Sequence, residues 1–407
     1  MSINYSQSQQ PGALSGVRVL DLSRILAGPY CTQILGDMGA DVVKVEQPII
    51  GDGSRAWGPP SAGGEAAYYL CVNRNKRSMT LNLKSAEGRE IVRRLAAKSD
   101  VLIENFKFGE MEKMGLSYES LAALNPSLIY CSISGYGPTG PYKERPGFDF
   151  MMQAQTGIMS INGSEESGPQ KVGVAVVDVT TGLYASSAIL AALFARERHP
   201  QKRGQKVEVS LYECALAWLA NVGSNYLVSG KTPRRWGNAH ANVVPYQPFE
   251  TADVPVAVAI GTDGQFRKFC KLVNRPELAQ DPRFATNPAR VENRDSLISI
   301  MRDIFIHRPA AEWEELLNRL DIPAGSINTL DRVFNHPQTL ALEIVQEIQH
   351  PTAGQVKLVR SPIHMSETPP AIQRHPPLLG EQTAELLHEL LDYKAEDISR
   401  LREEGVI

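Results

Sequence analysis

The sequence predicts an α/β protein in which a doubly wound, mostly parallel sheet forms a large domain and is followed by a smaller α+β domain. Short apolar runs alternate with helical periods from Val17 onward, which is typical of strand–helix–strand units. The chain has 407 residues, 43% of them hydrophobic, and is long enough for two cores. Near residue 225 the composition changes to a loop rich in Gly, Pro, Asn and Arg, which predicts the domain boundary.

The large domain is predicted to begin with a strand at 17–22, a helix from Pro29 and a strand at 42–46. Proline suits the first helical position because the N–H that it lacks would have no partner there. Ser85 is expected to cap the next helix, whose apolar positions share one face. The same pattern predicts a long helix at 181–198 and further strands at 101–103, 128–133, 172–177 and 206–210.

After a helix at 211–227, the loop at 230–248 opens the predicted small domain, which we place at residues 225–325. It contains a strand at 254–260 and helices at 265–273, 294–306 and 310–320. Residues 1–224 form the large domain, and residues 326–407, with helices at 381–391 and 395–404, are expected to return to it.

Charge and composition exclude several partners. The net charge of −3 gives no field that would gather nucleic acid or anionic lipid. The longest apolar stretches, 188–195 and 215–222, fall short of the roughly 20 residues that span a bilayer. The first thirty residues show no export signal, and the five cysteines show no paired spacing. We therefore expect a cytoplasmic protein with reduced thiols and neither membrane nor nucleic-acid partners.

Polar, glycine-rich loops follow the predicted strands. In doubly wound sheets, ligands bind beyond the carboxyl ends of the strands. The loops expected at that edge are 23–28, 46–53, 104–106, 134–140 and 178–182.

Several chemistries find no support in these loops. The loop at 23–28 lacks the G-x-G-x-x-G pattern of dinucleotide sites, although Glu46 occupies the place of a ribose-binding acid. Ser132 and Ser134 do not form the G-x-S-x-G motif of serine hydrolases. Neither H-E-x-x-H nor C-x-x-C occurs, so no metal site is predicted.

What remains is an acid, Asp178, where an apolar strand is expected to lead into a helix. Asp at a helix start usually acts as a cap or complements the helix dipole. Thr180 and Thr181 are alternative caps, which would leave the Asp178 carboxylate available for chemistry. The residues alone leave both roles open.

An ordered set of motifs resembles the class III coenzyme A transferases, the family that includes formyl-CoA transferase and carnitine CoA-transferase. The resemblance covers nearly the whole chain, through residues 14–21, 27–29, 39–46, 75–78, 104–106, 134–137, 178 with 181–182, and 377–383. Within the family, residues 235–240 and 244–247 resemble the succinate–hydroxymethylglutarate CoA-transferases.

The resemblance implies a Rossmann-like large domain built from both chain ends, in an interlocked homodimer. It assigns Asp178 as the nucleophile, which forms a mixed anhydride and then an aspartyl-CoA thioester. Coenzyme A and acyl-CoA are substrates, and no permanently bound cofactor is expected. By resemblance, succinyl-CoA is the donor and a dicarboxylate is the acceptor.

The resemblance also assigns binding residues. The coenzyme A contacts are Leu26, Ala27, Gln47, Leu81, Lys84, Asn105, Phe106, Lys107, Lys113 and Arg145. The acyl pocket is formed by Trp57, Tyr68, Phe148, Asp149, Arg235, Ala239 and His240. The loop at 237–242 is the candidate source of oxyanion donors, and Arg234 or Arg235 is a candidate partner for a second substrate carboxylate.

Two other functions compete with CoA transfer. An α-methylacyl-CoA racemase on the same fold would carry a histidine where this chain has Phe148, so its proton-transfer partner is missing. The other alternative is a catalytically silent CoA-binding protein.

Overall fold

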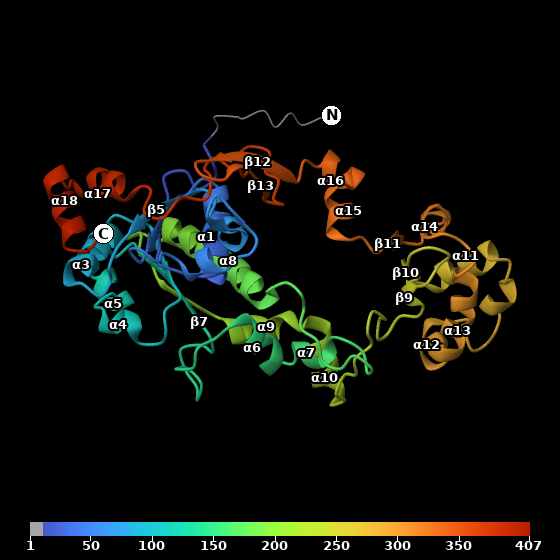
Figure 1. Cartoon of the computed structure of the whole chain (residues 1–407). Coiled ribbons are helices and arrows are strands. Elements are labelled where there is room, and N and C mark those ends of the chain that lie inside the picture. The colour runs from blue at the N-terminus through green and yellow to red at the C-terminus, as the bar shows by residue number, and fades with distance from the viewer. Residues whose placement is uncertain (1–10) are drawn as a thin grey trace. The chain divides into compact units, whose positions relative to one another are not determined.

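The computed structural model describes residues 11–407 (Figure 1), which divide into two compact units. The first unit comprises the described residues up to Ile158, Val172–Gly230 and Leu342–Ile407. The second comprises Met159–Lys171 and Lys231–Ala341. The sequence placed the boundaries near 225 and 325 and did not assign 159–171 to the smaller unit.

A six-stranded parallel sheet forms the centre of the first unit, as the sequence predicts. The strand order is β5-β2-β1-β6-β7-β8, which reverses direction between β1 and β6. Such a reversal opens a crevice at the carboxyl ends of the two strands. The strands are β1 (Arg18–Asp21), β2 (Asp41–Glu46), β5 (Lys76–Thr80), β6 (Val101–Glu104), β7 (Ile129–Ser134) and β8 (Lys206–Ser210).

Alternating side chains of these strands enter two cores, one on each face of the sheet. Val19 packs with one core and Leu20 with the other, as the period of two in a strand requires. Helices α1 (Ala27–Asp37), α8 (Val176–Arg198) and α9 (Leu211–Trp218) cover the first face. The second is covered by α3 (Ala86–Ala97), α4 (Glu110–Lys113), α5 (Tyr118–Ala122), α17 (Thr383–Leu391) and α18 (Ala395–Glu403). The doubly wound prediction is confirmed.

Residues 172–177 do not form the predicted strand. Instead α8 begins at Val176, five residues before the predicted helix start. The Val/Ala run suits a buried strand or a buried helix equally, so hydrophobicity cannot decide between them. The deciding contact is non-local: the Asp149 Oδ1 accepts the backbone N–H of Val177 at 2.7 Å and so fixes the helix start.

The predicted helix at 211–227 is also interrupted. It divides into α9 and α10 (Ala220–Ser229), which are separated by Leu219, and Ala220 at the start of α10 has φ 42°. The first unit further contains η1 (Gly53–Ala56), β3 (Ser61–Ala62), β4 (Glu65–Ala66), α2 (Ala67–Leu70), α6 (Asp149–Gln155), β12 (Val345–His350) and β13 (Gly354–Val359).

The second unit has its own core around an antiparallel sheet in the order β11-β10-β9. Stacked aromatic rings of Phe249, Phe269 and Phe305 pack in this core with Trp313. Its elements are β9 (Tyr246–Phe249), β10 (Val256–Ala259), α11 (Asp263–Leu272), η2 (Pro276–Ala279), α12 (Asn287–Glu292), α13 (Arg294–Phe305), α14 (Ala310–Asn318), β11 (Ala324–Ser326), α15 (Leu330–Phe334) and α16 (Pro337–Ala341). Helix α7 (Ile158–Ile161) begins at the last residue of the first unit's opening segment.

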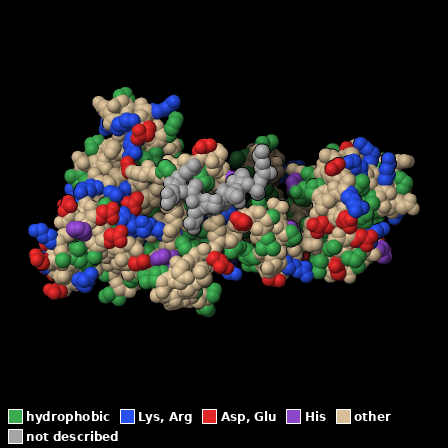
Figure 2. Space-filling view, turned by 90° about the horizontal axis from the view of Figure 1, so that it is seen from above, with side chains coloured by type: hydrophobic (Ala, Val, Ile, Leu, Met, Phe, Trp, Pro, Cys, Tyr) green, Lys and Arg blue, Asp and Glu red, His purple; other side chains and the backbone are tan. Residues whose placement is uncertain are grey.

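Lys and Arg side chains are interspersed with Asp and Glu on the face shown in Figure 2. Among the described residues, α8 is the one helix whose length and composition would suffice to cross a membrane. It packs against α1 and contributes Val177, Ala185 and Ile189 to the core, which accounts for part of its apolar composition.

Candidate active site

Asp178 lies in the first turn of α8, and its side chain is partly buried. The cap is supplied by Asp149 of α6, whose Oδ1 accepts the N–H groups of Val177 at 2.7 Å and Asp178 at 3.3 Å. Within residues 11–407, no hydrogen bond reaches the Asp178 carboxylate. Asp178 is therefore not the cap of its helix, and its oxygens are left for other partners.

The surroundings favour a proton on Asp178. Burial raises the pKa of its carboxyl to about 7, and the negative charge of Asp149 contributes to the rise. Its anion is thus destabilised relative to an exposed aspartate and, when formed, is more basic. Such a carboxylate is typical of functional sites.

Trp57 and Tyr68 pack together, and Tyr68 lies within electrostatic range of Asp178. The rings of Trp57 and Tyr68 meet edge to face, with centroids 5.0 Å apart. Burial raises the pKa of Tyr68 to about 12, and the charge of Asp178 is the next largest cause. The phenol is therefore protonated at neutral pH and can donate a hydrogen bond near the Asp178 carboxylate.

A close approach of two helices places Asp178 near the start of α1. A Cβ on Gly182 would lie 2.7 Å from the carbonyl oxygen of Ala27, so glycine is required where α8 crosses α1. Residues four apart share a face of a helix, and Asp178 is four residues before Gly182. Asp178 therefore faces the segment that carries Leu26 and Ala27, whose side chains are buried.

The predicted CoA-binding residues near Asn105 lie at the sheet's reversal point. The Asn105 side chain accepts the N–H of Arg24 at 2.9 Å and donates to its carbonyl at 2.8 Å. The Arg24 guanidinium lies 4.5 Å from the centre of the Phe106 ring. Glu104 accepts the N–H of Phe106 at 2.8 Å, and burial raises the pKa of this carboxyl to about 7. These contacts join the loops that follow β1 and β6.

The other predicted CoA contacts are mostly exposed. Gln47, Lys84, Lys107 and Arg145 are exposed, and Lys113 forms a surface ion pair with Glu110 at 2.9 Å. Leu81 differs, because its side chain is buried in the core. A ligand would meet Leu81 through its backbone.

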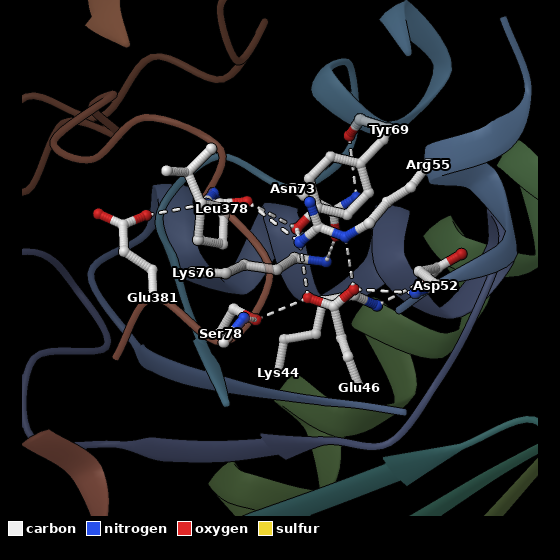
Figure 3. Close-up of polar contacts among 12 residues, drawn as sticks. Lys44, Glu46, Asp52, Arg55, Tyr69, Asn73, Lys76, Ser78, Leu378 and Glu381 are labelled. Carbon is white, nitrogen blue, oxygen red and sulfur yellow. Dashed lines mark hydrogen bonds and ion pairs between the residues drawn. The ribbon is translucent and has the colours of Figure 1, made fainter. Parts of the chain in front are cut away.

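A buried network of charges, shown in Figure 3, supports these loops. Lys44 pairs with Asp52 at 2.9 Å, and both side chains are fully buried. Lys44 also donates to the carbonyl of Ser23, and Asp52 accepts the N–H of Ile25, which has φ 71°. Burial alone would raise the pKa of Asp52, but the charge of Lys44 holds it well below its usual range. The network ties the loop after β1 to the loop after β2.

The predicted acyl-pocket residues fall into both units. Trp57, Tyr68, Phe148 and Asp149 belong to the first, whereas Arg235, Ala239 and His240 belong to the second. Phe148 is 58% exposed.

In the second unit, the segment around His240 is held by backbone contacts. The Arg235 Nε donates to the carbonyl of Ser164 at 3.0 Å. The N–H of Gly237 donates to Gly163, and that of His240 to Tyr246.

Comparison with known families identifies the class of enzyme. The model of CoA-transferase family III matches residues 14–383. The chain belongs to this family.

Relatives of this family III transferase are curated enzymes. The succinyl-CoA:glutarate CoA-transferase of Homo sapiens is 42% identical over 394 residues, covering 97% of this chain and 90% of the human protein. The succinate–glutarate CoA-transferase of Agrobacterium fabrum is 46% identical over 388 residues, covering 93% of this chain and 95% of the Agrobacterium protein. A crystal structure of a CAIB/BAIF family protein from Brucella suis, 46% identical, superposes with a TM-score of 0.83 and covers 94% of this chain and all of that one. The family III transferase described here is therefore an enzyme, and its fold is that of the CAIB/BAIF proteins.

Three features of the transferase were missed in the sequence. The capping role of Asp149 depends on a contact with residues 28 and 29 positions away. The Lys44–Asp52 pair looked like ordinary loop and strand charges, although a lysine inside an apolar strand was an available signal. Arg294, at the first position of α13, gave no signal, because arginine is common on helix surfaces.

Proposed function

We propose that this transferase moves coenzyme A from succinyl-CoA to a dicarboxylate, with Asp178 as the nucleophile. The observation that carries the proposal is a partly buried Asp178 carboxylate that accepts no hydrogen bond from the described residues and whose charge acts on the protonated Tyr68. The choice of donor and acceptor is supported by relatives named as succinyl-CoA:glutarate and succinate–glutarate CoA-transferases.

The proposed reaction proceeds through three covalent intermediates on Asp178, two mixed anhydrides and the thioester between them. An Asp178 oxygen attacks the thioester carbonyl of succinyl-CoA and the C–S bond breaks. CoA thiolate departs, and a mixed anhydride of Asp178 and succinate is formed. The thiolate then attacks the aspartyl carbonyl of the anhydride and releases succinate, which leaves an aspartyl-CoA thioester. The acceptor carboxylate attacks this thioester, and the released thiolate attacks the acceptor's carbonyl in the new anhydride. The product acyl-CoA departs, and the Asp178 carboxylate is regenerated.

The residues around Asp178 fit these steps. The protonated Tyr68 hydroxyl can donate to an anionic oxygen formed near Asp178, and Trp57 can help to keep water from the reactive intermediates. We assign coenzyme A to the loops joined by Arg24 and Asn105, with Lys84, Lys107, Lys113 and Arg145 as phosphate partners. No cofactor besides the substrates enters the scheme.

The test is incubation of the protein with succinyl-CoA and a panel of carboxylates, followed by mass detection of new CoA thioesters. We expect glutaryl-CoA, or another dicarboxylyl-CoA, from the unchanged protein and a loss of at least about 10³-fold in Asp178→Ala and Asp178→Asn. Intact-protein mass spectrometry after succinyl-CoA treatment should show a CoA adduct on the unchanged protein alone. Full activity in Asp178→Asn would contradict the proposal.

We further propose that the enzyme is a cytoplasmic homodimer. Large apolar side chains on α8, α9 and α10 are exposed, and a surface of this kind is typical of subunit contacts. They include Leu183 (47% exposed), Phe194 (62%), Trp218 (43%), Leu227 (82%) and Val228 (87%). All five cysteines are free thiols, which fits a reducing compartment.

A further inference from the structure

Two arginines stack on one indole in the second unit. The guanidinium carbons of Arg234 and Arg294 lie 3.9 Å and 4.3 Å from the centre of the Trp236 ring. Arg234 precedes the His240 segment, whereas Arg294 is the first residue of α13. We call Arg234, Trp236 and Arg294 the Trp236 cluster. The two positive charges that share this ring repel each other, so a nearby anion would be favourable.

The positive charge of the Trp236 cluster is poorly neutralised. Arg294 is 9% exposed, its Nη2 donates to the carbonyls of His240 and Ala241, and within residues 11–407 its Nε has no hydrogen-bond partner. No acid of the described residues lies within ion-pair distance of Arg294. Arg234 has one acid nearby, Glu165 at 3.8 Å, and both side chains are exposed.

The charged groups around Arg294 are thus Arg234 and the exposed Asp295. Burial lowers the pKa of Arg294, Arg234 lowers it further, and Asp295 raises it. Arginine nevertheless stays ionised in proteins, so the charge persists at neutral pH. An unpaired buried charge is costly, and a bound anion would offset that cost.

The segment beside the Trp236 cluster is held in place by hydrogen bonds within the protein. Arg294 holds the carbonyls of His240 and Ala241 at 2.9 and 2.8 Å. The N–H of Asn242 donates to the His240 ring, and the Asn287 amide donates to the carbonyl of Asn242 at 2.9 Å. The indole fixes both guanidiniums, so little side-chain entropy remains to be lost on binding.

We propose that the Trp236 cluster binds one carboxylate of a dicarboxylic substrate and so selects dicarboxylates over monocarboxylates. The inference rests on the proposed transferase function. The planar guanidinium matches a carboxylate in shape and can donate two parallel hydrogen bonds. Arg234 presents its exposed guanidinium to the ligand, and Arg294 adds fixed charge beside the same indole. Arg235 is secondary, because its Nε is already bound to the carbonyl of Ser164.

The test uses the full chain and two probes of equal length, glutarate and valerate. Calorimetric titration gives the Kd of each acid, and transfer from succinyl-CoA gives KM and kcat. The variants are Arg234→Gln, Arg294→Gln and Arg294→Lys. Arg302→Gln is the matched control, since Arg302 is an exposed arginine of the same helix.

We expect Arg234→Gln and Arg294→Gln to raise the Kd and KM for glutarate about tenfold or more and to leave the valerate values unchanged. Arg294→Lys should restore part of the glutarate affinity, and Arg302→Gln should match the unchanged protein. Glutarate values within twofold of the unchanged protein, or an equal loss for valerate, would overturn the proposal. If Arg294→Gln fails to fold, Arg234→Gln decides, because Arg234 is exposed and supports no loop.

The same measurements separate this inference from the proposed function. Glutarate binding that depends on Arg234, without any CoA transfer, would refute the transferase chemistry but would still support the proposed carboxylate site. Transfer to glutarate with an unaltered KM in Arg234→Gln would refute the site alone. Absence of both binding and transfer would refute both.

Discussion

Asp149 and Asp178 share one helix start but have different environments. Asp149 accepts two backbone N–H groups at the start of α8, which stabilise its anion. Asp178 accepts none from the described residues, and both its burial and the negative charge of Asp149 raise the pKa of its carboxyl. One carboxylate is thereby fixed as a cap, and the other is left as a basic group.

The pair predicts how activity depends on pH. Protonated Asp178 cannot attack a thioester, so kcat/KM should fall as the pH drops below about 7. Asp149→Asn keeps an oxygen for the N–H of Val177 but removes the negative charge, which lowers the pKa of Asp178. The acidic limb of the pH profile should therefore move to lower pH. Asp303→Asn, an exposed change on α13, is the control, and an unmoved limb in Asp149→Asn would refute this coupling.

The same carboxyl predicts a cost in stability. The folded-state pKa of Asp178, about 7, exceeds the unfolded value of about 4, so its contribution to stability is lost as the pH rises from about 4 to 7. Asp178→Asn should increase the free energy of unfolding by about 1–3 kcal/mol at pH 8. The gain should vanish near pH 4. Urea denaturation at both pH values measures it, and an equal gain at both would point to another cause.

At the scale of elements, the contact of α1 with α8 sets the position of Asp178. Gly182→Ala would push a methyl group against the Ala27 carbonyl and Tyr30, so we expect a loss of about 1–3 kcal/mol and a lower kcat. Gly264→Ala is the matched helical control: its nearest neighbours are 3.7 Å away or more, and alanine should be neutral or slightly stabilising there. Thermal melts and transfer assays compare the two. Equal effects would show that α8 tolerates displacement.

The elements also show what could be predicted from the sequence. Strands β1, β2, β6, β7 and β8 were predicted because each contains a short run of apolar or β-branched residues between helical segments. Strand β5 was missed because its buried residues include Lys76, which pairs with Asp21, and Arg77, which pairs with Asp41. Asp178 was singled out from its place before a helix, but its role as nucleophile, like the roles of Trp57 and Tyr68, came only from family motifs. Local sequence could not reveal that Asp149 caps α8.

At the scale of the whole molecule, the exposed apolar side chains of α8, α9 and α10 predict dimer formation. Val228→Asp would place a charge in the proposed contact, so sedimentation should show a shift from dimer to monomer. Leu124→Asp, which adds a charge to an exposed leucine elsewhere in the first unit, should leave the assembly unchanged. A monomeric unchanged protein, or a dimeric Val228→Asp variant, would refute the proposed interface.

The first unit's second core is completed by residues far apart in the chain. Leu386, Leu387, Ile398 and Leu401 pack with Ile91, Leu95 and Leu20. During translation, residues 386–401 leave the ribosome after the entire second unit has been made. Helices α3, α4 and α5 can cover part of that face early, but the part that packs against α17 and α18 stays open until the C-terminal residues are made, whereas the second unit's core can close sooner. The nascent chain thus leaves part of the apolar surface of β1, β2 and α3 accessible to chaperones until α17 and α18 emerge.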